Sequence, residues 1–193
     1  DSEDNIYFTK AINEGIREFK YYEKYILILN QDCYIRKGSL KRMVEFMDSN
    51  ENCGMCSPIT VDSNENVTFA GGKSAFPEGQ HFHEILSEKP YRTHWLNGAC
   101  MFIRTNMIEE IGLFDENMEF ICSDSDYSYT ARSRGWSLYM IPDAFAEHEL
   151  HGSVSTESKL LDRKMKDILY FQKKWWNSQL FFDLDYSHTE YCR

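Results

Sequence analysis

The sequence has no apolar run long enough to cross a bilayer and no pattern typical of a signal peptide. Its longest apolar runs are short stretches such as Tyr25 to Leu29. We therefore expect a cytoplasmic protein without a transmembrane segment, and peripheral contact with a membrane or with a second copy stays open. The chain begins with Asp1 rather than Met, directly before a helix-like segment, so we expect it to be cut from a longer polypeptide.

The chain also lacks the basic surplus that binding to nucleic acid requires. It has 31 acidic and 21 basic residues, which gives a net charge of −10. Proteins bind phosphate backbones through Lys and Arg, so we expect no nucleic-acid partner. An acidic protein that handles phosphate groups is expected to do so through a metal ion.

The six cysteines do not form the dense pattern of a disulfide-rich domain, and we expect reduced thiols. Cys53 and Cys56 have the spacing of half a zinc site or of a redox pair, but no second pair of this kind exists. The favoured interpretation is two ordinary buried cysteines.

Hydrophobic periodicity predicts an α/β fold in a single domain-sized chain of 193 residues. Apolar residues recur at helical spacing between Phe8 and Phe19, and the run 25–29 is typical of a central strand covered on both faces. A second helix is expected to be capped by Ser39. Pro142 is expected to end the last strand. Residues 54–94 are expected to be irregular and on the surface, with short β-like pieces at 55–61 and 67–69 that could form a hairpin. The remaining expected strands are 99–103 and 138–141, and the remaining helices are 105–111, 124–134 and 158–176.

Polar residues just past the ends of buried strands lie where open α/β sheets bind ligands. Asn30 and Asp32 follow the strand 25–29 in this way, although a turn with an aspartate cap explains the pattern equally well. His148 follows the last predicted strand. A lone histidine is more often structural, and His151 nearby is a competing candidate. Asp32 and His148 together would form a site for Mg²⁺ or Mn²⁺, completed by substrate phosphates.

A pair of carboxylates, Asp124 and Asp126, lies at the start of a predicted helix. The helix dipole favours acidic side chains there, so capping explains one of them. Two carboxylates separated by one residue also suit a division of labour, with one as a base and the other orienting a substrate or metal.

Several motifs occur in an order known from one enzyme family. They are Asn5 to Ile16 with Asn13 and Gly15, Leu29-Asn-Gln-Asp32, Trp95-Leu-Asn-Gly98 to Arg104, Ile111 to Glu116, Ser123-Asp-Ser-Asp126 with Arg132 and Gly135-Trp136, and His148 with Ser153. Over nearly the whole chain up to about Ser153, this order resembles the inverting family-2 glycosyltransferases of the GT-A fold, especially the rhamnosyltransferase-like members that build bacterial polysaccharides.

The resemblance implies a GT-A (Rossmann-like) mixed sheet flanked by helices. Residues 1–153 would form the glycosyltransferase domain, and residues 154–193 a helical extension packed on it. The chain departs from the family pattern at Tyr7, where a glycine is usual, and at Ser123, where a glutamate is usual. It also lacks a counterpart of the family's first strand, so we expect a domain that is partial at its N-terminus.

The resemblance further implies transfer of a sugar, with inversion, from a UDP-, GDP- or dTDP-linked donor to a hydroxyl of a glycan or glycolipid. Asp32 and His148 would hold Mn²⁺ or Mg²⁺, Asp124 would be the general base, and Asp126 would position the base or the acceptor. The substrate-binding residues would be Asn13, Asn30, Trp95, Asn97 and Gly98, with core packing as an equal alternative for Trp95. Two alternatives stay open, a non-catalytic fragment that binds a sugar or a protein and a structural domain whose carboxylates are caps.

Overall fold

The structure is a computed structural model that describes residues 7–75, 79–149 and 158–176, so His151, Ser153 and Cys192 lie outside the described residues. None of the described helices has the length and apolarity to cross a bilayer. The helices are α1 (Tyr7–Phe19), α2 (Ser39–Ser49), α3 (Thr105–Ile111), α4 (Ser123–Ser133) and α5 (Ser158–Trp175). The strands are β1 (Tyr25–Leu29), β2 (Cys33–Ile35), β3 (Cys53–Val61), β4 (Val67–Phe69), β5 (Gly72–Lys73), β6 (Gln80–His81), β7 (Tyr91–Arg92), β8 (Cys100–Arg104) and β9 (Ser137–His148).

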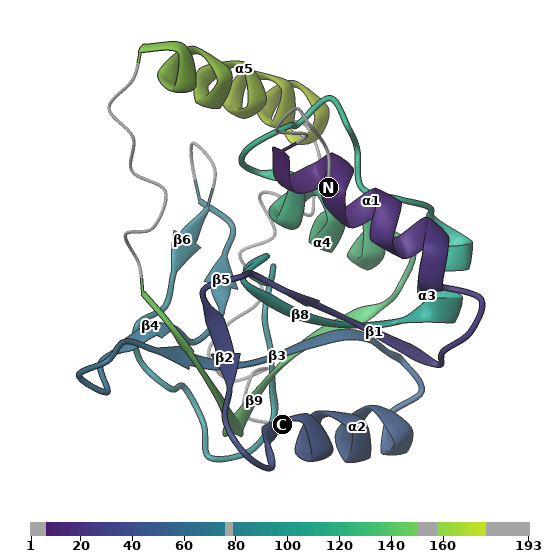
Figure 1. The fold of residues 1–193 in the computed structure, drawn as a ribbon, viewed down its shortest axis with the longest axis vertical. Coiled ribbons are helices and arrows are strands. Elements are labelled where there is room, and N and C mark those ends of the chain that lie inside the picture. Colours follow the sequence, from purple (N-terminus) through teal and green to yellow (C-terminus); the bar gives the residue numbers. More distant parts are fainter. Residues whose placement is uncertain (1–6, 76–78, 150–157, 177–193) are drawn as a thin grey trace.

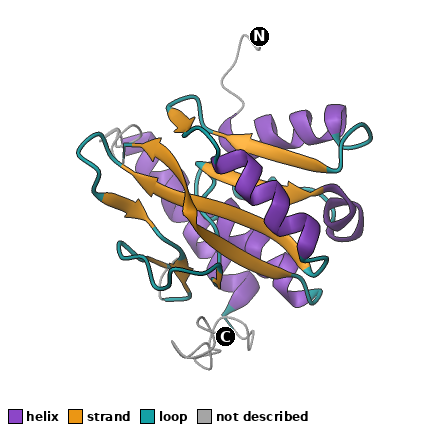
Figure 2. Ribbon diagram, turned by 90° about the horizontal axis from the view of Figure 1, so that it is seen from below, coloured by secondary structure: helices purple, strands orange, loops and turns teal. Residues whose placement is uncertain are grey.

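A seven-stranded mixed sheet forms the centre of the fold. Its order is β1-β8-β3-β9-β2, with β4 paired to β3 and β7 to β9, and β3 and β9 run parallel. Helix α2 lies on one face, α1, α3 and α4 lie on the other, and α5 lies beyond α1 and α4 (Figure 1; Figure 2). Strands β5 and β6 form a separate two-stranded sheet. This arrangement confirms the predicted mixed sheet flanked by helices.

Successive side chains of the central strands point into two different cores, as the strand geometry requires. Met55 of β3 and Met101 of β8 belong to the core beneath α1, α3 and α4. Cys56 and Phe102, the next residues along each strand, belong to the core beneath α2. Cys53 is also fully buried there, and the described cysteines are free thiols. The expectation of two ordinary buried cysteines in this motif is therefore confirmed.

The sheet corrects three expectations about strands. Strand β3 contains the expected β-like piece 55–61 and pairs antiparallel with β4, but it is buried over its whole length and not on the surface, because both of its faces are covered. Strand β1 was expected to be central but lies at the end of the sheet, and Leu29 is 42% exposed. Strand β9 continues through Pro142, because its register against β3 shifts there and a residue without an N–H is tolerated.

The start of α2 also differs from expectation. Gly38 precedes the helix with φ of 87°, in the left-handed region that favours glycine. The Ser39 hydroxyl accepts a hydrogen bond of 2.8 Å from the backbone N–H of Phe145 in β9 and does not cap its own helix. Ser39 therefore fastens α2 to the strand that carries His148.

Candidate active site

A cavity of about 1130 Å³ opens beside α1, at the point where β1 and β9 end and α4 begins. Most of the predicted site residues line it, although they come from distant parts of the chain. They are Asn30 and Asp32 after β1, Trp95, Asn97 and Gly98 before β8, Asp124 in α4, and His148 at the end of β9.

Asp32 and His148 form a pair on one wall of the cavity. Strand β2 pairs with β9 so that Cys33 lies opposite His148, and this register brings Asp32 next to the imidazole. The Nε2 atom of His148 lies 3.5 Å from Oδ1 of Asp32. A carboxylate oxygen and an imidazole nitrogen at this spacing are ligands that Mg²⁺ and Mn²⁺ accept.

The pair fits a metal that is shared with a substrate. Among the residues that the structure describes, no group of three or more His, Cys, Asp or Glu side chains could hold a metal ion. Asp32 and His148 would thus supply two protein ligands, and the other positions would need water or phosphate oxygens. This is the usual way in which Mg²⁺ is bound together with a phosphate-bearing substrate.

Asp124 lies in the first turn of α4 with its carboxylate held by two backbone amides. Its Oδ2 accepts a hydrogen bond of 3.0 Å from Gly98 N, and its Oδ1 accepts one of 2.7 Å from Ser125 N. Burial raises the pKa of the Asp124 carboxyl above its ordinary value, and these two amides and the nearby His81 oppose the rise. A carboxylate that is fixed in orientation and raised in pKa is suited to accept a proton.

The turn that donates to Asp124 needs a glycine. A Cβ atom on Gly98 would lie 2.3 Å from the ring of Phe8 in α1, far inside van der Waals contact. The Asn97 side chain stabilises the same turn, because its Oδ1 accepts a hydrogen bond of 2.8 Å from Ala99 N. Close packing of α1 on this turn therefore fixes the amide that orients Asp124.

For Trp95 the sequence left open a choice between sugar binding and core packing, and the structure shows the residue packed. It is only 4% exposed, and its Nε1 donates a hydrogen bond of 3.2 Å to Lys73 O, as in core packing. It also lines the cavity, beside His81, whose ring centroid is 5.0 Å away. Sequence reasoning missed His81 because it lies in the stretch expected to be irregular. Gly72 leaves room for the indole, since a Cβ there would be 2.2 Å from it.

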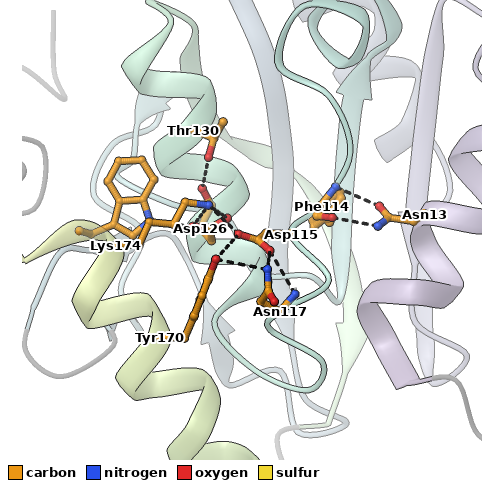
Figure 3. Close-up of polar contacts among 9 residues, drawn as sticks. Asn13, Phe114, Asp115, Asn117, Asp126, Thr130, Tyr170 and Lys174 are labelled. Carbon is orange, nitrogen blue, oxygen red and sulfur yellow. Dashed lines mark hydrogen bonds and ion pairs between the residues drawn. The ribbon is translucent and has the colours of Figure 1, made fainter.

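Asn13 and Asp126 do not line the cavity. The Asn13 side chain exchanges two hydrogen bonds of 2.9 Å with the backbone of Phe114 and so holds the segment after α3 (Figure 3). Asp126 is 2% exposed and faces Lys174 of α5. In this structure both side chains join neighbouring elements, and neither is among the residues that line the cavity.

The backbone at Tyr7 has the shape that a glycine favours. Its φ is 59°, in the left-handed region, where a residue with a Cβ is strained by about 1–2 kcal/mol. At Tyr7, where the family pattern has a glycine, the backbone at the start of α1 therefore adopts a conformation that glycine favours.

Comparisons with known proteins agree with this geometry. Residues 8–166 match the family described as "Glycosyltransferase like family 2". The chain is 25% identical over 146 residues to "dTDP-rhamnosyl transferase RfbF" of Shigella flexneri. The matched region covers 73% of this chain and 48% of that protein. The chain thus spans about half the length of this curated relative.

A solved structure, "Crystal structure of GalNAc-T7 with UDP, GalNAc and Mn2+", superposes with a TM-score of 0.71 at 15% sequence identity. The match covers 94% of this chain and 37% of that one, and at this identity it speaks for the fold alone. The family resemblance and the predicted fold are both confirmed. The chain belongs to glycosyltransferase family 2 and has the GT-A fold.

Proposed function

We propose that this chain transfers a sugar from a nucleotide-sugar donor to an acceptor hydroxyl, with inversion at the anomeric carbon. The observation that carries the proposal is that one cavity brings together Asp124 and the pair of Asp32 and His148. Asp124 is a candidate base, and the pair of Asp32 and His148 is a candidate cation site. The family match supports the reaction class.

The donor would bind with its diphosphate near Asp32 and His148. Mn²⁺ or Mg²⁺ held there, when bound, would neutralise the negative charge that develops on the departing diphosphate. The two side chains would orient the diphosphate from the wall formed by β2 and β9. The similar GalNAc-T7 structure was crystallised with UDP and Mn²⁺, and the similar RfbF is named for a dTDP-linked sugar, which supports a donor of this class.

Asp124 would accept the proton of the acceptor hydroxyl as its oxygen attacks the anomeric carbon. The new bond forms on the face opposite the nucleotide, while the bond to the diphosphate breaks and its electron pair leaves with the nucleotide. A single displacement of this kind inverts the configuration. The amides of Gly98 and Ser125 would hold the carboxylate still during the transfer, and Trp95 would offer an apolar wall to a sugar ring.

The acceptor in this proposal is a growing polysaccharide or a glycolipid, in keeping with the rhamnosyltransferase-like relative. We also propose a cytoplasmic location, which the free thiols of the described cysteines support. Residues 154–193 would form a helical extension of the catalytic domain, to which the described helix α5 belongs.

Nucleotide binding provides the first test. Thermal unfolding is measured with UDP, GDP and dTDP, each with and without Mn²⁺. A metal-dependent rise in Tm with one of these nucleotides is the expected result. A transfer assay then follows release of the matching nucleoside diphosphate from its sugar conjugate. No shift with any nucleotide, with or without Mn²⁺, would instead favour the non-catalytic sugar- or protein-binding module.

A further inference from the structure

The last turn of α5 is joined to the first turn of α4 through a buried carboxylate. Asp126 of α4 is 2% exposed. Trp175 Nε1 donates a hydrogen bond of 2.7 Å to it, and Lys174 Nζ lies 2.9 Å from the same carboxylate. Figure 3 shows Lys174 reaching from α5 to Asp126. The two helices are thus connected by charge and not only by apolar packing.

Lys174 also holds the segment that leads into α4. Its Nζ lies 3.0 Å from Oδ2 of Asp115, and the hydroxyl of Tyr170 donates a hydrogen bond of 3.3 Å to the same carboxylate (Figure 3). One ammonium group therefore joins α5, the segment after α3, and α4. Phe171 and Trp175 pack on Tyr129 of α4 beside it. In the ion pair itself the Asp126 side chain is 3% exposed and the Lys174 side chain 33%.

This contact differs from an ordinary surface ion pair because its carboxylate is buried. Burial raises the pKa of the Asp126 carboxyl, and Lys174 and the Trp175 N–H oppose the rise. A buried carboxylate that loses its partner is left with an uncompensated charge, which destabilises the structure around it. Removal of Lys174 alone would therefore act directly on the first turn of α4.

That turn carries Asp124. Successive residues of a helix are about 100° apart, so Asp124 and Asp126 point to nearly opposite sides, one toward the cavity and the other toward α5. On the same side as Asp124, one turn later, Ser128 Oγ donates a hydrogen bond of 2.7 Å to Asp124 O and accepts one of 3.1 Å from Leu96 N. The start of α4 is therefore held between the cavity wall and α5.

We propose that Lys174 and Trp175 are positioning residues that fix the first turn of α4 through Asp126 and so aim Asp124 at the cavity. This inference rests on the base role proposed for Asp124. Lys174 acts on the first turn of α4 through Asp126, and its contact with Asp115 holds the segment that leads into the helix. Asp32, in the turn before β2, and His148, at the end of β9, lie outside this contact.

The test replaces Lys174 in the full chain and separates turnover from donor binding. Lys174→Met is expected to lower kcat about tenfold or more, since small displacements of a catalytic group cost up to about a hundredfold. The KM for the nucleotide sugar is expected to stay within about twofold, because the diphosphate side is untouched. Lys174→Arg keeps the charge and is expected to keep most of the kcat.

Two further variants distinguish positioning from general damage to the fold. Lys173→Met changes an exposed residue of the same helix turn and is expected to leave kcat unchanged. The double variant Asp126→Asn with Lys174→Met leaves no unpaired buried charge and is expected to recover much of the lost kcat. Equal loss of kcat in Lys173→Met, or no recovery in the double variant, would contradict the proposal.

Hydrogen exchange gives a readout that needs no turnover. Lys174→Met is expected to speed amide exchange about tenfold or more in residues 123–128 and to leave α2 unchanged. If the wild-type chain transferred no sugar, the proposed function would fail, yet faster exchange in 123–128 would still support the anchoring of α4 by α5. Unchanged kcat together with unchanged exchange in this turn would overturn the inference.

Discussion

The imidazole Nε2 of His148 lies 3.5 Å from Oδ1 of Asp32, and both side chains line the cavity that also contains Asp124. The pairing of β2 with β9 produces this proximity, because it sets Cys33 opposite His148. Asp124 reaches the same cavity from a helix on one face of the sheet. The structure thus separates the two parts of the proposed chemistry, with the cation ligands in the turn before β2 and at the end of β9, and the base on a helix.

The cation role of Asp32 predicts a specific loss in Asp32→Asn. The variant keeps the shape of the side chain but removes a hard anionic ligand, so metal-assisted binding of UDP or dTDP is expected to weaken about tenfold or more. Isothermal titration with and without Mn²⁺ measures this. Asp143→Asn is the matched control, because Asp143 is an exposed carboxylate of β9 that pairs with Arg42 at 3.1 Å and does not line the cavity. Equal metal-dependent affinity in both variants would exclude Asp32 as a ligand.

The base role of Asp124 predicts loss of turnover without loss of binding. Asp124→Asn is expected to lower kcat by about 10²–10⁴ and to leave nucleotide affinity unchanged. Steady-state kinetics and titration of the nucleotide give the two quantities. Glu149→Gln is the control, since Glu149 is an exposed carboxylate that lines the same cavity. Retained turnover in Asp124→Asn would remove it from the base role.

The variant Asp124→Asn also has an expected effect on stability. Burial raises the pKa of Asp124 in the folded chain, so folding disfavours the ionised form and this group lowers the stability at neutral pH. A neutral amide removes that cost, and Asp124→Asn is expected to unfold at the same Tm as the wild type or at a higher one. Thermal unfolding at neutral pH tests this, and a clearly lower Tm would contradict it.

The pH dependence of turnover follows from the same pKa. A base must be deprotonated, so kcat is expected to fall as the pH falls through the pKa of Asp124. Because burial raises this pKa above the ordinary value of 3.8, the acid limb is expected at a higher pH than for an exposed aspartate. A profile of kcat from acid to neutral pH measures its position. An acid limb at or below 3.8 would show that another group controls the rate.

The substitution Gly72→Ala tests the packing around Trp95, and Gly15→Ala is a control away from it, with the opposite expected effect on stability. In Gly72→Ala the new Cβ would lie 2.2 Å from the indole, so we expect destabilisation by about 1–3 kcal/mol. Gly15→Ala, in the interior of α1 with no atom within 4 Å of the new Cβ, is expected to stabilise by about 0.5–1 kcal/mol. Urea unfolding gives both free energies. Equal effects in the two variants would show that the indole moves aside freely.

The elements that the sequence predicted well have a strong local signal. The helical spacing between Phe8 and Phe19 identified α1, and the uninterrupted apolar run identified β1. The β-like pieces at 55–61 and 67–69 became β3 and β4, but the burial of β3 could not be predicted, because both of its faces are covered and no alternation marks it. The position of β1 at the end of the sheet could not be predicted either, since strand order depends on contacts between distant residues.

The side chains available for chemistry and the family of the chain could both be read from the order of the motifs between Asp32 and His148, because this order is a property of the chain. Which of these residues meet in one cavity depends on how the distant elements fold together. Asp124 and Asp126 are alike in chemistry and adjacent in motif, yet the turn of α4 directs one to the cavity and the other to Lys174. The physical reason is that the surroundings of a side chain, and with them its charge and its partners, are set by elements far away in the sequence.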